Sequence, residues 1–115
     1  MILTKRAYDP PQPGDGLRIL VDRLWPRGIT KEHLAIDDWI KDISPSTELR
    51  QWFAHEPAKW PHFVEKYSRE LDENKACWEA LLKKAQRHRV TLIYGAKDME
   101  HNNAVALKQY LEAKQ

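Results

Sequence analysis

The chain is poor in cysteine and has no long hydrophobic run. Its one cysteine, Cys77, cannot form a disulfide within the chain, which favours a reducing compartment. No apolar stretch approaches the roughly 20 residues that a membrane-spanning helix needs. The first residues also lack the hydrophobic segment of a signal peptide, because the charged pair Lys5 and Arg6 follows almost at once. We therefore expect a cytoplasmic protein with no membrane segment.

Glycine is also scarce, with four residues in 115, and the glycine-rich motifs of common enzyme classes are missing. The absence of G-x-G-x-x-G, of a Walker phosphate loop and of a G-x-S-x-G elbow argues against nucleotide cofactors and serine hydrolase chemistry. His55-Glu56 begins like a zinc-protease motif, but Lys59 stands where the second His is required, and Pro57 interrupts the helix. We expect neither a metal nor an organic cofactor.

An excess of one charge is lacking as well. The 19 Lys and Arg and 17 Asp and Glu residues leave a net charge of +2, which by itself does not predict nucleic-acid binding. Hydrophobic residues make up 42% of the chain and charged residues 31%, as in ordinary globular proteins. A length of 115 residues allows one core, so we expect a single domain over residues 1–115.

Two short apolar runs each end in a dense polar cluster. Leu17–Val21 precedes DRLWPRG at 22–28, and Val90–Tyr94 precedes GAKDMEHNN at 95–103. Arg18 interrupts the first run, so we expect one face or one end of that strand to lie near solvent. If both strands run parallel, the two clusters meet in one crevice at the carboxyl edge of the sheet, where ligands usually bind.

The segment between these strands has helical patterning. Thr30 is a candidate N-cap for a short helix that would place Leu34, Trp39 or Ile40 on the core, and Ser46 is a candidate N-cap for a helix over 47–53. Further predicted core positions lie on two later helices and a final one, at Phe63, Tyr67, Leu71, Trp78, Leu81, Leu82, Ala85, Val105, Leu107, Tyr110 and Leu111. Trp52 is also expected in the core.

The order of elements is strand, loop, strand, several helices, strand, helix. This order predicts an α/β fold, a small three-layer domain with a short, mainly parallel sheet and a long helical crossover before the last strand. The first strand, near Ile2–Lys5, has no predicted direction. If it is parallel to the others, Lys5 and Arg6 join the crevice, and if it is antiparallel they lie at the opposite end.

The two polar clusters carry the side chains of an anion-binding site. Arg offers a planar fork of donors for phosphate or carboxylate, and the start of the last helix offers backbone N–H groups. We predict ligand contacts from Arg23, Arg27, Lys97, Asn102 and Asn103, with Trp25 as an apolar wall. The predicted catalytic groups are Asp22 or Asp98 as base or water-orienting carboxylate, and His101 as proton carrier.

Each of these residues also has a purely structural interpretation. Asp98 or Asn103 can cap a helix, and Asn102 can satisfy exposed backbone groups. Arg23 or Arg27 can pair with Asp22 to hold the turn after the strand.

Four stretches resemble the YeaO-like family of small bacterial proteins of unknown function. They are VDRLWPRG at 21–28, DISPSTELR at 42–50, WFAH at 52–55 and KDMEHNNA at 97–104, which together extend over nearly the whole chain. The resemblance implies a bacterial, cytosolic α/β protein and supplies no established activity. It adds Ser46, Thr47, Glu48, Arg50 and His55 to the candidate site, and of these we take Arg50 and His55 as ligand contacts.

The residues support three functional hypotheses. The first is a protein that binds, and hydrolyses or transfers, a small phosphate- or carboxylate-bearing molecule. The second is a noncatalytic sensor that uses the same crevice. The third is nucleic-acid binding through basic groups and exposed aromatic rings, which would be strongly salt-dependent. The sequence leaves the oligomeric state open.

Overall fold

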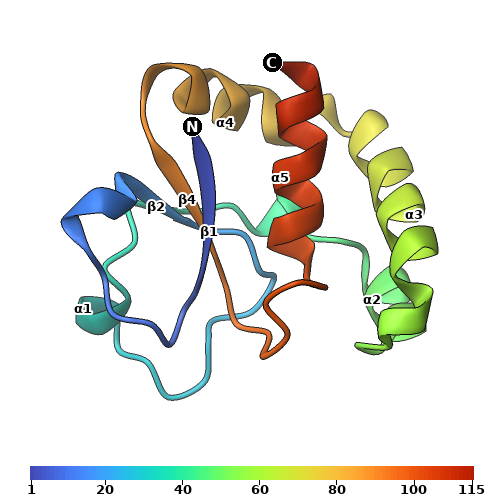
Figure 1. Ribbon diagram of the computed structural model, residues 1–115, viewed down its shortest axis with the longest axis horizontal. Helices are drawn as coiled ribbons and strands as arrows, with labels where there is room; N and C mark the ends of the chain where they lie inside the picture. Colours follow the sequence, from blue (N-terminus) through green and yellow to red (C-terminus); the bar gives the residue numbers. More distant parts are fainter.

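Four parallel strands form the sheet in the computed structural model, which describes residues 1–115 (Figure 1). They are β1 (Ile2–Arg6), β2 (Leu17–Leu20), β3 (Asp38–Trp39) and β4 (Val90–Tyr94), and their spatial order is β1-β4-β2-β3. The central strand β4 is the most apolar run of the chain and is buried along its whole length. The fold is therefore α/β with an all-parallel sheet, as predicted.

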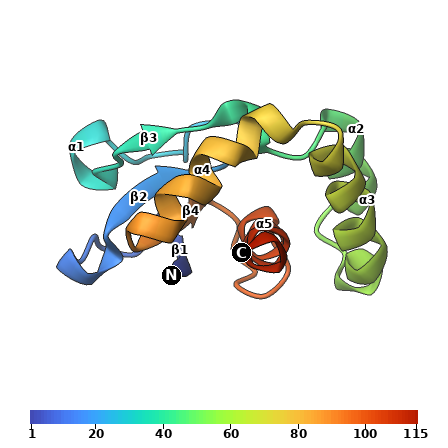
Figure 2. The same ribbon diagram turned by 90° about the horizontal axis from the view of Figure 1, so that it is seen from above.

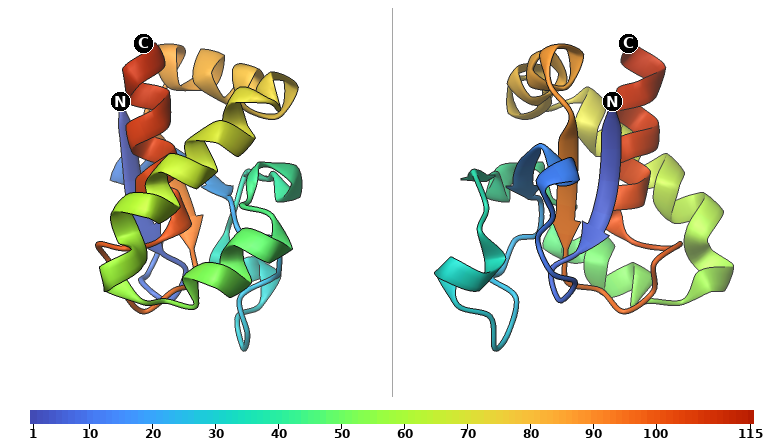
Figure 3. Two further views of the ribbon diagram at one scale, coloured as in Figure 1. Left: turned by 90° about the vertical axis from the view of Figure 1, so that its right-hand side faces the viewer. Right: turned by 60° about the vertical axis from the view of Figure 1, so that its left-hand side comes forward.

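The register aligns the ends of the three longer strands. Val90 of β4 pairs with Ile2 of β1 on one side and with Leu17 of β2 on the other. Figure 3 shows the arrowheads of β1 and β4 pointing toward the end of the molecule where the loops after the strands lie, while both termini lie at the opposite end. The first strand is thus parallel to the others. Lys5 nevertheless stays away from the crevice, because it pairs with Asp15.

Strand β3 was not predicted, because a two-residue pairing has no detectable alternation. Trp39 lies on this strand and not on the helix capped by Thr30, which ends at Leu34. The prediction for Trp52 was also wrong, since it is 37% exposed and carries Lys59 and Lys66 near its ring.

Five helices and three short 3-10 segments complete the chain. The helices are α1 (Lys31–Leu34), α2 (Thr47–Phe53), α3 (Trp60–Asp72), α4 (Lys75–Arg87) and α5 (Asn103–Lys114), and the 3-10 segments are η1 (Pro13–Asp15), η2 (Lys41–Ile43) and η3 (Pro57–Lys59). Thr30 and Ser46 cap α1 and α2 as predicted, with hydroxyl oxygens that accept the N–H groups of His33 and Leu49. A capping residue followed by apolar residues at helical spacing thus marks where both helices begin.

The two faces of the sheet are covered unequally. Alternate strand residues, including Ile19 and Leu92, face the main core under α3, α4 and α5. Figure 2 shows α5 lying between the sheet and α3. On the other face, Leu20 and Ile93 pack against Leu34 and the loop that precedes and follows α1. The third layer of the fold is therefore a loop with a one-turn helix.

Arg18 is buried, against the expectation that its part of β2 lies near solvent. It is 4% exposed, and its Nη1 lies 2.6 Å from Oδ2 of Asp15, which is itself 6% exposed. Lys5 Nζ approaches the other carboxylate oxygen at 2.9 Å. Two more Arg18 nitrogens donate to the carbonyl of Leu34. This charge cluster holds η1 against the face of the sheet that Leu34 also covers.

The buried carboxylate of Asp15 makes the stability of the fold dependent on acid. Burial raises its pKa, but hydrogen bonds from Lys5, Gln12 and Arg18 outweigh burial and hold the pKa below its usual value of 3.8. The pKa of Asp15 is lower in the folded than in the unfolded protein. The ionised carboxylate therefore stabilises the fold fully above the unfolded pKa, and this stabilisation is lost as the pH falls through the folded pKa.

We expect Asp15→Asn to lower the free energy of unfolding by about 3 kcal/mol at neutral pH, because it leaves the buried Arg18 and the half-buried Lys5 without a counter-ion. The difference from the parent protein should shrink below about pH 4. Urea denaturation across this pH range measures both effects. Asp9→Asn, an exposed change in the same loop, is the control. Equal stability of the Asp15 and Asp9 variants at neutral pH would contradict the account.

Candidate functional site

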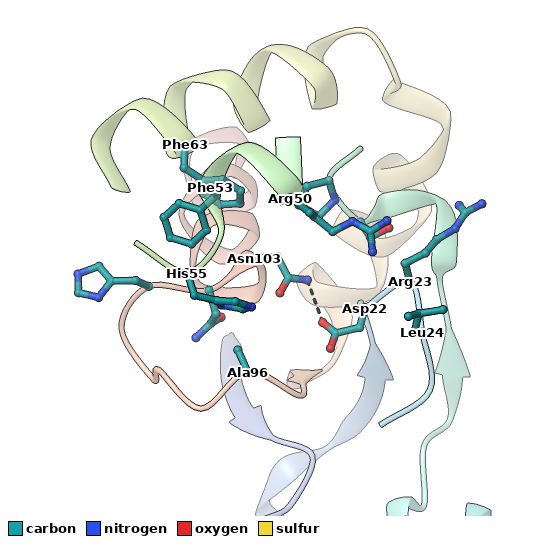
Figure 4. A pocket seen from close by; sticks show the side chains of 13 residues that line it. Asp22, Arg23, Leu24, Arg50, Phe53, His55, Phe63, Ala96 and Asn103 are labelled. Carbon is teal, nitrogen blue, oxygen red and sulfur yellow. Dashed lines mark hydrogen bonds between the residues drawn. The ribbon is translucent and has the colours of Figure 1, made fainter. Parts of the chain in front are cut away.

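A pocket of about 270 Å3 opens at the carboxyl edge of the sheet. Its walls come from the loops after β2 and β4, from the start of α5 and from α2 with the turn that follows it (Figure 4). The residues that line it are Asp22, Arg23, Leu24, Ser44, Pro45, Arg50, Phe53, His55, Phe63, Ala96, His101, Asn102 and Asn103. The two polar clusters after β2 and β4 therefore do meet in one crevice.

Asp22 lies at the floor of this pocket and joins three elements. Its Oδ2 accepts the backbone N–H of Gly95 at 2.8 Å, and its Oδ1 accepts the side-chain amide of Asn103 at 3.0 Å. Gly95 suits this close approach, since a Cβ there would lie 3.3 Å from Oδ2 of Asp22. The end of β2, the end of β4 and the start of α5 are thus held together by one carboxylate.

The environment of Asp22 opposes its ionisation. Burial raises the pKa of Asp22 above its usual value. The hydrogen bonds from Gly95 and Asn103, together with the nearby charges of Arg50 and His55, lower the pKa but do not outweigh burial. None of the salt bridges in the structure includes Asp22.

Arg50 extends from α2, and its guanidinium lies on the side of the pocket where Asp22 and Arg23 stand (Figure 4). One terminal nitrogen donates to the hydroxyl of Thr47 at 2.9 Å, whereas Nε is buried and meets no acceptor. Buried side-chain donors are almost always paired in folded proteins. This Nε is the only buried side-chain nitrogen or oxygen of the chain without a partner.

The turn after α2 is strained where it brings His55 into the pocket. Ala54 and His55 have φ values of 48° and 57°, so two successive residues other than glycine adopt the left-handed conformation. The N–H of Ala54 caps α2 by donating to the carbonyl of Arg50. The ring of His55 points toward Asp22 in Figure 4. Strain of this kind costs about 1–3 kcal/mol per residue and concentrates at functional sites.

Arg23 lies at the rim of the pocket. Its guanidinium points away from Asp22 (Figure 4) and lies 3.6 Å from the exposed carboxylate of Asp42. A second, wider groove of about 780 Å3 adjoins the pocket at this rim, and both Arg23 and Arg50 line the two spaces.

In the segment before α5, the polar side chains mainly form hydrogen bonds within the segment. Asp98 accepts the backbone N–H groups of Glu100 and His101 and pairs with the His101 ring at 2.9 Å, and these contacts lower the pKa of Asp98. The Asn102 side chain caps α5 by accepting the N–H of Val105 and donates to the carbonyl of Asp98. His101 and Asn102 still line the pocket.

Three predicted ligand contacts do not line the pocket. Trp25 packs on Trp39, with ring centroids 5.5 Å apart, and donates its Nε1–H to the carbonyl of Ile29. Arg27 is exposed and contributes its carbonyl to the hydroxyl of Tyr8. Lys97 is exposed as well. The other predicted catalytic and ligand-contact residues, except Asp98, line the pocket directly. Of the further candidates from the family resemblance, Ser46 and Thr47 line the adjoining groove and Glu48 lines neither space.

The apolar lining of the pocket was missed by the site prediction. Phe53 and Phe63 lie 4.5 Å apart between ring centroids, and Phe63 was predicted only as a core residue. Leu24 and Pro45 belong to the motif stretches quoted above, but nothing in the sequence distinguishes them from turn residues. Their role depends on how α2 and α3 pack.

Two further features concern metal-ligating clusters and membrane-spanning helices. No group of three or more His, Cys, Asp or Glu side chains is arranged to hold a metal ion. No helix combines the length and the apolar character required to cross a membrane.

The fold and the pocket define an α/β protein with a parallel sheet and an aromatic-lined polar site at its carboxyl edge. The family model described as "Inactive DUF488-N3 subclade" matches residues 1–115, and the chain belongs to this family. It is 46% identical to the uncharacterized protein YeaO of Escherichia coli (strain K12) over 112 residues, which cover 97% of each chain. It is 38% identical to the uncharacterized protein Rv3073c of Mycobacterium tuberculosis (strain ATCC 25618 / H37Rv) over 109 residues, 95% of this chain and 92% of the relative.

These matches confirm the YeaO-like resemblance. No solved structure matches the chain. The relatives carry no assigned activity in their names, so the site has to be interpreted from its own geometry.

We expect His55→Gly to raise the free energy of unfolding by about 1 kcal/mol, because glycine adopts a positive φ without steric cost. Ala35→Gly is the control, since Ala35 caps α1 with a φ of 49° on the other side of the sheet. Urea denaturation measures both variants. If Ala35→Gly stabilises the protein and His55→Gly destabilises it, the His55 side chain supports the fold and is not held there for function.

Proposed function

We propose that this protein binds a small phosphate- or carboxylate-bearing molecule in the pocket at the carboxyl edge of its sheet. The observation that carries the proposal is Arg50, whose buried Nε has no partner and whose guanidinium lies beside the pocket. A guanidinium is the donor group best matched to planar or tetrahedral oxyanions. An anion that accepts from Nε satisfies the one buried side-chain donor that the fold leaves unpaired.

The charges of the pocket support an anionic ligand. Arg50 contributes a positive charge that no salt bridge uses, Arg23 adds a second at the rim beside Asp42, and Asp22 contributes at most one negative charge. His55 and His101 add positive charge when they are protonated. The volume of about 270 Å3 lies just below the range typical of sites for drug-sized ligands, so the ligand is small.

Binding without chemistry fits the pocket better than turnover. The only lining residue with a hydroxyl is Ser44, and it donates to the carbonyl of Lys41. No base is hydrogen-bonded to it, so the usual activation of a serine nucleophile is missing. The word "Inactive" in the description of the family model supports the same interpretation. We therefore favour a noncatalytic ligand-binding protein of the bacterial cytoplasm.

Hydrolysis or group transfer is the second candidate, and the Asp98–His101 pair favours it. A carboxylate that orients a histidine at 2.9 Å is a common arrangement for a general base. In this scheme His101, with Asp22 or Asp98, would activate water near an anion held by Arg50. A ligand that binds and is released unchanged would decide for the noncatalytic function.

Nucleic-acid binding has less support. It would use exposed aromatic rings beside basic groups, and Trp52 with Lys59 and Lys66 is one such group. The Trp25 ring, however, is half-buried against Trp39. The net charge of +2 and the concave site favour a small ligand.

We expect inorganic phosphate to shift the Nε–H resonance of Arg50 saturably in a 15N NMR titration, because the buried donor gains an acceptor. Arg50→Gln should weaken phosphate binding about tenfold or more, since a hydrogen bond to a charged group is lost. Arg69→Gln on the exposed face of α3 is the matched control and should leave the affinity unchanged. Equal phosphate affinities of the parent and the Arg50 variant would refute the proposal.

A further inference from the structure

The floor of the pocket consists of hydrogen-bond acceptors. Asn103 donates both N–H groups of its side-chain amide, one to the carbonyl of Val21 at 3.2 Å and one to Oδ1 of Asp22 at 3.0 Å. Its amide oxygen is left without a donor and points into the pocket (Figure 4). The orientation of this amide is set by its two acceptors, because a flipped amide would place oxygen against oxygen.

Asp22 adds further accepting capacity beside that oxygen. A carboxylate offers about four lone-pair positions. Only two of them are used in Asp22, by the N–H of Gly95 and by the amide of Asn103. Neither Arg50 nor His55 forms a salt bridge with it. The amide oxygen of Asn103 thus has no protein donor, and the Asp22 carboxylate beside it has accepting capacity that Gly95 and Asn103 do not use.

The remaining lining of the pocket offers a hydrogen-bond donor and apolar carbon instead of acceptors. Arg50 has a buried Nε without an acceptor, and aromatic carbon of Phe53 and Phe63 lines the space on the α2 and α3 side (Figure 4). A simple anion satisfies Arg50 and leaves the acceptors of the floor unpaired. A molecule that carries an anionic group and an N–H donor on one apolar frame satisfies both sides.

We propose that the ligand is amphoteric: an acid that binds Arg50 and also carries an amino or similar N–H group, which donates to Asp22 and Asn103. This inference rests on the proposed anion-binding function and adds the chemical class of the ligand. A bound ligand excludes water from the acceptors of the floor, so an analogue that lacks the N–H group leaves these acceptors unpaired and binds more weakly. Discrimination in this pocket therefore comes from the floor and not from Arg50.

The test uses benzoate and its ortho-, meta- and para-amino derivatives, which share one ring and one carboxylate. The three isomers place an N–H donor at three distances from the anion, so the spacing between Arg50 and the floor need not be assumed. We expect at least one aminobenzoate to bind about tenfold more tightly than benzoate in isothermal titration calorimetry at neutral pH. The N,N-dimethyl derivative of that isomer should lose the gain, because its nitrogen has no hydrogen to donate.

The protein side of the test is Asp22→Asn, which keeps the size of the side chain and removes its charge. The preference for the aminobenzoate over benzoate should fall to about onefold to threefold in this variant. If Asp22→Asn does not fold, as judged by its circular dichroism spectrum, the dimethyl comparison on the parent protein carries the test alone. Arg50→Gln should weaken benzoate and aminobenzoate equally.

The outcomes separate this inference from the proposed function. If benzoate and all aminobenzoates bind with equal affinity and lose it equally in Arg50→Gln, the amphoteric ligand is wrong and the anion site stands. If inorganic phosphate binds at Arg50 and no benzoate derivative binds, the amphoteric ligand is again wrong. If neither phosphate nor any benzoate derivative binds, both proposals are wrong.

Discussion

The candidate site depends on the carboxylate of Asp22. By accepting the N–H of Gly95 and the amide of Asn103, it fastens the segments that leave β2 and β4 to the first turn of α5. Parallel pairing places these three segments at one edge of the sheet, and Asp22 sets how closely they approach. The hydrogen bonds compensate only part of the cost of burying the carboxylate, which is why the pKa of Asp22 is raised.

The other side of the pocket is built by α2, and here too stability is given up. Arg50 keeps a buried donor unpaired, and the helix ends in two residues with positive φ. Each feature lowers the free energy of unfolding. Glycine would avoid the cost of a positive φ, and a shorter side chain at position 50 would avoid the cost of the unpaired donor. One unpaired buried donor, an amide oxygen without a protein donor and two successive residues with positive φ meet at one pocket of about 270 Å3, whereas the charges of Lys5, Asp15 and Arg18 under η1 are paired with one another. This contrast is the main reason for assigning function to this edge.

Much of the fold could be predicted from local patterns. The runs at 17–21 and 90–94 are apolar and β-branched, and Ser46 and Thr30 precede helices as side-chain caps do. The meeting of the two polar clusters followed from parallel topology. The two-residue strand β3 and the burial of Arg18 could not be predicted, because both depend on partners distant in sequence, Leu20 for β3 and the carbonyl of Leu34 for Arg18.

The candidate site was only partly predictable for a related reason. Asp22, Arg23 and Asn103 follow directly from strand ends, whereas Arg50 and His55 came from the family resemblance, because no local pattern says which face of α2 reaches the crevice. Trp25, Arg27 and Lys97 stand in the same clusters, yet none of them lines the pocket, since Trp25 packs on Trp39 and the other two are exposed. Sequence position identifies the loop, and packing decides which of its side chains enter the pocket.

The central claim is that this pocket holds an anion at Arg50. The most direct measurement is a crystal structure of the protein soaked in selenate, whose selenium is located by its anomalous scattering. We predict a selenium peak inside the pocket, with a selenate oxygen within hydrogen-bond distance of Nε of Arg50. Selenate found only on exposed lysines and arginines, with no peak beside Arg50, would contradict the account.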